Sequence, residues 1–299
     1  MKLSIAALIL SFSVFQGAAQ VLYTQNGEHP IAYQTFGKGD PLVIINGGPG
    51  MNSDGFAPIA REIAERYNLM TIIYDQRGTG KSSLDAVNDK TISMELMVKD
   101  LESLRKHLGV KSWIVMGHSF GGMLASFYVT QYPDAIDKLI LSSSGGYDLS
   151  LLSTLNIRRN LTANQLDSLN YWSHLSSINS SAETSYMRAK YLAPAYLYYD
   201  SDKHISKIAE RLTQVNMDIN QLVFSNMQVI NFDCSTALKS FEKPTLIIQG
   251  VNDVLGIEIA KNTHEILPNS KLVLIDQCAH YGWLDQPEEF FSSLAEFLQ

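Results

Sequence analysis

The sequence has little cysteine and no concentration of positive charge, and both shortages limit what the protein can be. Only 2 of its 299 residues are cysteines, Cys234 and Cys278. Their separation gives no metal-ligand spacing, and it fits either a disulfide or two buried thiols. Acidic residues outnumber basic ones, 30 to 23, and Lys and Arg form no dense cluster. We therefore expect no nucleic-acid partner and no binding to an anionic membrane surface.

The first 19 residues have the three parts of a secretory signal peptide. Lys2 provides a basic start, residues 3–15 are mostly apolar, and the small residues at 17–19 suit a signal peptidase. The apolar run is too short to span a membrane comfortably. A buried N-terminal helix or an uncleaved anchor is the alternative. We expect residues 1–19 to be removed, which leaves a periplasmic or secreted protein without stable membrane insertion.

Six short apolar runs predict the strands of a layered α/β sheet. Their apolar residues are continuous rather than alternating, which is typical of strands buried on both faces of a parallel sheet. Helical patterns lie between most of them, as in residues 94–108, where Met and Leu recur at helical spacing before Gly109. A mostly parallel sheet flanked by helices is therefore the predicted fold. The runs occupy residues 41–47, 70–75, 112–117, 137–144, 244–250 and 271–276.

Residues 147–238 interrupt this alternation of strands and helices. They contain no clear buried strand, are rich in Ser, Asn, Leu and Tyr, and have the pattern of several amphipathic helices. An insertion of this length between two strands is usually a functional unit rather than a loop. We predict a separate helical unit over 147–238, inserted into a core made of residues 20–146 and 239–299.

A serine between glycines is the candidate nucleophile. Residues 117–121 (GHSFG) match the G-x-S-x-G pattern and lie between a predicted strand and a predicted helix. Such a turn is so tight that only small residues fit around Ser119, and Gly117 and Gly121 provide the space. The Phe120 N–H, at the start of the helix, can donate to an oxyanion. A plain turn between strand and helix is the alternative interpretation.

A serine nucleophile needs a base and a carboxylate that orients the base. In this pattern the acid and then the histidine follow the serine along the chain. Asp253 and His280 each follow a predicted strand, at the edge where open α/β sheets place their sites. Helix capping is the alternative role for Asp253, and Asp148 is the second choice of acid. The sequence thus predicts Ser119, Asp253 and His280 as a catalytic triad.

A glycine-rich segment, residues 46–50 (NGGPG), is predicted to give the second oxyanion donor. We favour the N–H of Gly48, with Gly47 as second choice, because glycine lets the backbone approach a ligand closely. Residues 80–82 (GKS) look like the end of a phosphate-binding loop, but Asp75 stands where that motif needs a glycine. We therefore expect neither a nucleotide nor a metal cofactor.

Together these motifs resemble the proline iminopeptidases, a family of α/β-hydrolases. Residues 46–50 are similar to the family's HGGPG loop, and residues 75–82 (DQRGTGKS) to its D-Q-R-G-x-G-x-S segment. The elbow at 117–122 and the segment 280–290 resemble the family as well. The resemblance implies an α/β-hydrolase fold with a helical cap over the site. It also implies a serine aminopeptidase that releases an N-terminal residue, often proline, from small peptides.

Two departures from the family's pattern concern the site and its substrate. Asn46 stands where the family has histidine, and the cap has few glutamates, of which Glu183 and Glu210 are candidates to bind the substrate's ammonium. A buried ammonium without an acidic partner is costly, so a cap without such a pair favours a carboxylesterase or lactonase on the same triad. A non-catalytic ligand-binding protein is a third hypothesis, and the complete set of Ser, Asp and His argues against it. Arg77 is expected to brace its loop by hydrogen bonds.

Overall fold

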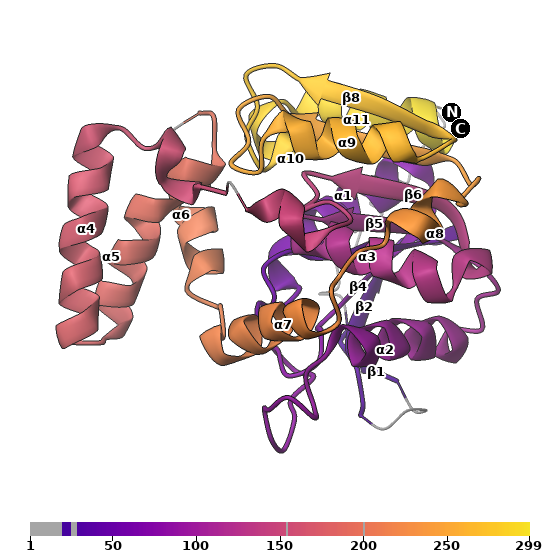
Figure 1. Ribbon diagram of the computed structural model, residues 1–299, viewed down its shortest axis with the longest axis horizontal. Coiled ribbons are helices and arrows are strands. Elements are labelled where there is room, and N and C mark those ends of the chain that lie inside the picture. Colours follow the sequence, from indigo (N-terminus) through magenta and orange to yellow (C-terminus); the bar gives the residue numbers. More distant parts are fainter. Residues whose placement is uncertain (1–19, 25–28, 154, 200) are drawn as a thin grey trace, which may run out of the picture.

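An eight-stranded sheet lies at the centre of the protein, between two groups of helices (Figure 1). The computed structural model describes residues 20–24, 29–153, 155–199 and 201–299, so the predicted signal peptide at 1–19 lies outside the described residues. The strand order is β1-β2-β4-β3-β5-β6-β7-β8. β2 is antiparallel to both of its neighbours, and β3 to β8 run parallel. The bounds are Leu22–Tyr23 (β1), Ala32–Phe36 (β2), Asp40–Ile45 (β3), Leu69–Tyr74 (β4), Trp113–His118 (β5), Ile136–Ser142 (β6), Thr245–Gly250 (β7) and Ser270–Ile275 (β8).

The strands β3 to β8 are those that the continuous apolar runs predict. Each begins and ends within two residues of the predicted run. Every residue of β5 and of β7 is buried, which explains why neither strand alternates between apolar and polar residues. The predicted fold, a mostly parallel sheet flanked by helices, is therefore confirmed.

Different helices cover the two faces of the sheet. Val43 and Ile45 of β3 belong to an apolar cluster with α2, α3 and α9, whereas Leu42 and Ile44 belong to a cluster with α1 and α11. The pleat causes this division, because successive side chains of a strand point to opposite faces. No helix in the described ranges is long and apolar enough to cross a bilayer. The bounds are α1 (Ala57–Tyr67), α2 (Met94–His107), α3 (Phe120–Gln131), α9 (Ile257–Ile266), α10 (Gly282–Asp285) and α11 (Pro287–Leu298), with the 3₁₀ turns η1 (Asp54–Phe56) and η2 (Pro133–Ala135).

The segment between β6 and β7 contains helices and no strand in its described residues. Ile219, Val223 and Leu238, from α7 and α8, belong to the same cluster as α2 and α3. α5 and α6 instead form a separate apolar cluster with Tyr281, and Figure 1 shows α4 and α5 apart from the sheet. The predicted cap boundaries, 147 and 238, stay a prediction. The elements are η3 (Leu149–Leu152), η4 (Ile157–Asn160), α4 (Ala163–Ile178), α5 (Ala182–Leu192), η5 (Ala193–Tyr196), α6 (Asp202–Leu212), α7 (Met217–Val229) and α8 (Ser235–Lys239).

Arg77 braces the loop after β4, as the sequence analysis predicts. Its guanidinium forms a two-pronged pair with Asp100 of α2, with both N–O distances at 2.7 Å. It also donates to the carbonyl of Thr91 at 2.8 Å. The Arg77 side chain is 3% exposed and that of Asp100 10%. A buried pair of this geometry fixes the loop to the helix.

The two cysteines are free thiols and not a disulfide. Cys234 and Cys278 are both buried. Burial raises the pKa of both thiols above the usual range for cysteine. Because the thiolate is the reactive form, both side chains act as small apolar groups in the core.

Candidate active site

Ser119 lies in the tight turn between β5 and α3, in a backbone conformation that is rare for a residue other than glycine. Its φ is 57° and its ψ is −122°. Such a conformation costs on the order of 1–3 kcal/mol, and it persists at functional sites. The neighbouring glycines are required, because a Cβ on Gly117 would lie 2.4 Å from the carbonyl oxygen of Gly121, and one on Gly121 would lie 2.0 Å from that of Ile45. The turn therefore holds the serine at the carboxyl end of the sheet.

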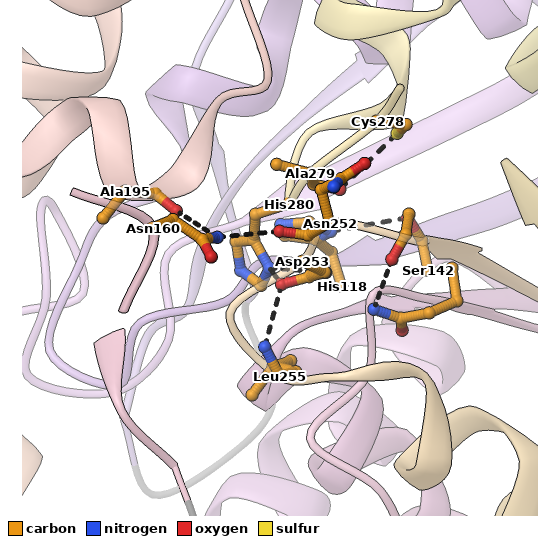
Figure 2. A network of polar contacts seen from close by, with 12 residues as sticks. His118, Ser142, Asn160, Ala195, Asn252, Asp253, Leu255, Cys278, Ala279 and His280 are labelled. Atoms are coloured by element: carbon orange, nitrogen blue, oxygen red, sulfur yellow. Dashed lines mark hydrogen bonds and ion pairs between the residues drawn. The ribbon is translucent and has the colours of Figure 1, made fainter. Parts of the chain in front are cut away.

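His280 and Asp253 come from the loops that follow β8 and β7, and their side chains meet (Figure 2). Nδ1 of His280 lies 2.9 Å from Oδ1 and 3.1 Å from Oδ2 of Asp253. The Leu255 N–H donates to Oδ1 of the same carboxylate at 3.1 Å. With Nδ1 held by the carboxylate, Nε2 is the nitrogen that remains for a substrate or a nucleophile.

Asp253 is fully buried and yet ionised at neutral pH. Burial by itself would raise the pKa of this carboxyl group, but the charge of His280 and the hydrogen bonds from His280 and Leu255 outweigh burial and lower the pKa. A buried carboxylate favours the histidine tautomer with its proton on Nδ1. The environment of Asp253 is therefore that of an orienting acid.

The inserted helices hold the Asp253 loop in place. Asn160 of η4 donates to the carbonyls of Asn252, at 2.7 Å, and Ala195, at 3.4 Å, as Figure 2 shows. Arg159 donates to the carbonyl of Asp253 itself. The backbone N–H of His280 donates to the carbonyl of Tyr196 at 3.1 Å. The insertion and the sheet core thus build the acid–base pair together.

Ser119 and His280 line one cavity of about 80 Å³ between the sheet core and the insertion. The hydrogen bonds of the described residues include none between Ser119 Oγ and the His280 ring. Catalytic contacts of this kind often shorten only when substrate binds. The lining residues are Gly47, Gly48, Met51, His118, Ser119, Tyr196, Arg211, Leu212, His280 and Tyr281.

The two glycines predicted for the oxyanion hole also line this cavity. A Cβ on Gly47 would lie 2.5 Å from Ser119 Cβ and 3.2 Å from its Oγ, so only glycine fits there. The N–H of Gly48 and the N–H of Phe120 donate to no acceptor among the described residues. Asn46 supports the loop from within, because its side chain donates to the carbonyls of Gly47 and Met51. Two unused donors beside a nucleophile suit a developing oxyanion.

The structure does not bring the other candidate acids to Ser119. Asp148 caps η3 by accepting from the Ser150 N–H. Glu183 is exposed in the first turn of α5. Glu210 is exposed on α6 and lines a neighbouring cavity of about 400 Å³, between α6 and α1. An ammonium-binding role for either glutamate stays a prediction.

Arg211 of α6 lines the Ser119 cavity, although no motif of the sequence points to it. The residue is 5% exposed. Nη2 donates to the carbonyl of Gly47 at 2.8 Å and Nη1 to that of Asn52 at 3.3 Å. The guanidinium carbon lies 4.7 Å from the ring centroid of Phe56. One signal was available: Arg211 follows Ile208 by three positions and precedes Leu212, so it falls on the apolar stripe of its helix.

His118, inside the elbow, is a second buried residue for which the sequence motifs predict no role. It is 1% exposed, and its ring centroid lies 4.7 Å from that of His280. Nδ1 lies 3.4 Å from Ser142 Oγ, and Nε2 has no partner among the described residues. Burial, followed by the charges of His280 and Arg211, lowers its pKa well below the usual value. His118 is therefore neutral and has an unused polar atom.

A family model described as the alpha/beta hydrolase fold matches residues 40–287. The chain belongs to the α/β-hydrolase family. It is 26% identical over 265 residues to a proline iminopeptidase of Lactobacillus helveticus (strain DPC 4571), which covers 86% of this chain and 89% of that protein. The resemblance drawn from the motifs is thus confirmed, and the protein is a hydrolase.

Two solved structures show how widely this hydrolase's fold is shared. A proline iminopeptidase of Mycobacterium smegmatis superposes with a TM-score of 0.71 at 21% identity, over 93% of this chain and 97% of that one. An esterase of Exiguobacterium antarcticum superposes with a TM-score of 0.69 at 19% identity, over 94% and 99%. Because proteins named for both activities have this fold, the fold alone does not decide the substrate. Among the described residues, no group of three or more His, Cys, Asp or Glu is arranged to hold a metal.

Proposed function

We propose that this hydrolase is an exported serine hydrolase that acts through an acyl-enzyme on Ser119. The observation that carries the proposal is the His280–Asp253 pair, which opens on the same cavity as a serine held at positive φ. A strained serine, an oriented histidine and a buried carboxylate at the ends of three parallel strands are the parts that acyl transfer needs.

Each step of the reaction uses a group already described. Ser119 Oγ attacks the substrate carbonyl while His280 Nε2 takes the hydroxyl proton. The carbonyl oxygen becomes an oxyanion that accepts from the N–H groups of Gly48 and Phe120. His280 then gives the proton to the leaving group, which departs and leaves the acyl-enzyme. Water then attacks the acyl carbonyl while His280 takes its proton, and His280 returns that proton to Ser119 Oγ as the acid product leaves. Asp253 keeps the imidazole in one tautomer throughout.

The first candidate substrate is a small peptide with a free N-terminus. The similarity to a named proline iminopeptidase over most of the chain supports it. The helical insertion beside the cavity agrees with a cap that selects small substrates. Glu183 and Glu210 are the candidates to bind the ammonium group, and Glu210 lies one position from the cavity-lining Arg211.

The second candidate is a carboxylesterase or lactonase on the same triad. One observation favours it: the lining of the Ser119 cavity contains Arg211 and no carboxylate. A guanidinium repels an ammonium group at close range. An ester substrate needs no ammonium site, so it avoids that repulsion.

The deciding experiment compares amides with esters. Purified protein is given prolyl and alanyl aryl-amides and short-chain aryl esters, with Ser119→Ala as the inactive variant and the exposed Ser292→Ala as the matched control. Amide cleavage that needs Ser119 and stops when the amine is blocked establishes the aminopeptidase. Ester cleavage alone establishes the esterase. Equal rates in the wild type and Ser119→Ala on every substrate would contradict the serine mechanism.

Export is tested separately, on the N-terminus of the secreted protein. Expression of the full chain in a bacterium, followed by mass spectrometry of the periplasmic and extracellular fractions, should find a mature protein that starts near Gln20. A chain that keeps residues 1–19 and stays with the cells would contradict the export proposal.

A further inference from the structure

Arg211 is a buried cation whose partners are carbonyl oxygens and a tyrosine rather than a carboxylate. A guanidinium has five N–H donors, and those of Arg211 reach the carbonyls of Gly47 and Asn52 and the Tyr281 side chain. Arg211 makes no ion pair with any described carboxylate. Tyr281 lies beside it and also lines the cavity. The positive charge thus has no ion-pair partner among the described carboxylates, and it lies at the wall of the Ser119 cavity.

The carboxylates nearest to Arg211 lie outside the Ser119 cavity and are not paired with it. The Ser119 cavity has no acidic lining residue. Arg211 also lines the cavity between α6 and α1, where Asp54, Glu62 and Glu210 are the acidic residues, and none of them forms an ion pair with it. A buried charge without a partner is costly. An anion that enters the Ser119 cavity would remove this cost.

The position of the guanidinium places such an anion close to the reaction. Arg211 donates to the carbonyl of Gly47, and Gly47 is packed directly against Ser119. The cavity of about 80 Å³ is small, so an anionic group of the substrate that reaches Arg211 must lie close to the carbonyl that Ser119 attacks. His118 Nε2, buried and without a described partner in the same cavity, is a second polar atom for the ligand.

We propose that Arg211 binds a carboxylate of the substrate and so selects small esters or amides that carry a negative charge near the scissile carbonyl. A guanidinium presents paired donors that match a carboxylate, and it stays charged at working pH. The proposal rests on the proposed serine hydrolase function of the same cavity. The carboxylate belongs either to the acyl part or to the leaving group, and the test below separates the two.

The test uses pairs of substrates that differ only in that charge. For the acyl side, phenyl hydrogen glutarate is compared with methyl phenyl glutarate, and release of phenol is measured. For the leaving-group side, 3-acetoxybenzoate is compared with its methyl ester. Alanylglycine against alanylglycinamide is the corresponding pair for an enzyme that cleaves only amides. Spontaneous hydrolysis is subtracted with Ser119→Ala.

The expected result is a preference for the free acid in one of these pairs. One charged hydrogen bond should make kcat/KM for the free acid about 10- to 100-fold higher than for its uncharged counterpart. Arg211→Gln should remove the preference, and Arg211→Lys should keep part of it. Lys207→Gln is the matched control, because Lys207 lies one turn earlier on α6. It lines the cavity between α6 and α1 and not the Ser119 cavity. It should leave the preference unchanged.

A purely structural role for Arg211 predicts a different pattern. If Arg211 only clamps α6 to the Gly47 loop, its loss would lower kcat/KM equally for both members of each pair, and that result would overturn the proposal. A wild-type enzyme that prefers the methyl ester or the amide in every pair would also overturn it. This second outcome needs no variant, so misfolding of Arg211→Gln does not affect it.

Binding separates this inference from the proposed function. Calorimetric titration of glutarate and of benzoate into Ser119→Ala, and into Ser119→Ala/Arg211→Gln, measures the anion site without any turnover. Binding that needs Arg211 supports the site even if every hydrolysis assay fails. Equal or absent binding in both proteins would contradict the anion site while leaving the hydrolase proposal standing.

Discussion

Arg77 and Arg211 are the buried arginines of the described chain, and the protein treats them in opposite ways. Arg77, in the sheet core, meets Asp100 through two hydrogen bonds of 2.7 Å. Arg211, where the insertion meets the core, meets only carbonyl oxygens, an aromatic face and Tyr281. Their exposures are nearly equal, 3% and 5%, so burial does not explain the difference.

The difference lies in what each arginine faces. Arg77 is enclosed between its loop and α2, where a carboxylate from the chain itself completes the pair. Arg211 faces a cavity that also contains Ser119 and His280. A charge that is paired internally holds the fold, whereas a charge that is left unpaired beside a nucleophile is available to a ligand. The comparison therefore predicts loss of stability at Arg77 and loss of selectivity at Arg211.

The largest expected effect tests whether the Arg211 cavity is the reaction site at all. Asp253→Asn should lower kcat by up to about 10⁴-fold, because an amide no longer holds the His280 ring in the required tautomer. The rate is measured on whichever ester or amide the wild type cleaves. Asp148→Asn is the matched control, since Asp148 caps η3 and does not contact His280. A large loss of kcat in Asp148→Asn and none in Asp253→Asn would mean that Asp148, and not Asp253, is the catalytic acid.

The next effect concerns the stability that Arg77 provides. Arg77→Met should lower the free energy of unfolding by about 3–5 kcal/mol, because it takes the guanidinium away from the buried Asp100 carboxylate. Urea unfolding followed by tryptophan fluorescence measures the loss. The double variant Arg77→Met/Asp100→Leu should be more stable than the single one, since it removes both charges. If Arg77→Met were as stable as the wild type, the pair of Arg77 with Asp100 would not stabilise the fold.

Arg211→Gln should have a smaller effect on stability than Arg77→Met. The loss of hydrogen bonds to two carbonyls costs about 1–2 kcal/mol, and the removal of an unpaired buried charge offsets part of it. Glutarate at concentrations well above its dissociation constant should raise the thermal midpoint of the wild type and leave that of Arg211→Gln unchanged. A destabilisation as large as that of Arg77→Met would mean that Arg211 is also a structural residue.

The contrast between these two regions also explains what the sequence could predict. The strands of the core are predicted within two residues, because continuous burial produces continuous apolar runs. Ser119, Asp253 and His280 are found by motif and chain order, and the structure brings Asp253 and His280 into contact. The strand order and the antiparallel pairing of β2 with β4 depend on contacts between distant segments, which no local pattern encodes.

The insertion is harder to interpret from sequence for a geometric reason. Successive residues of a helix point about 100° apart, so the docking of α6 decides whether Glu210 or Arg211 faces the nucleophile. Glu210 is one of the two glutamates that the sequence offers to bind an ammonium group, and that role stays a prediction; in the fold, α6 exposes Glu210 and buries Arg211. Contacts of α6 with distant parts of the chain fix that rotation: apolar contacts with Tyr281 and hydrogen bonds from Arg211 to the segment after β3.

The smallest expected effect is on the pH dependence of stability in the catalytic region. The pKa of Asp253 is lowered in the folded protein, because the charge of His280 and hydrogen bonds outweigh the opposing effect of burial. The unfolded chain therefore takes up this proton first, near the ordinary aspartate value of about 3.9. The ionised carboxylate stabilises the fold above that pH, and the contribution is lost as the pH falls through the folded pKa. The unfolding free energy of the wild type, taken relative to that of Asp253→Asn, should thus fall from pH 6 towards about pH 3. If the wild type instead gained stability relative to Asp253→Asn on acidification, burial would dominate the pKa of Asp253. The carboxyl group would then be too weakly ionised to orient His280.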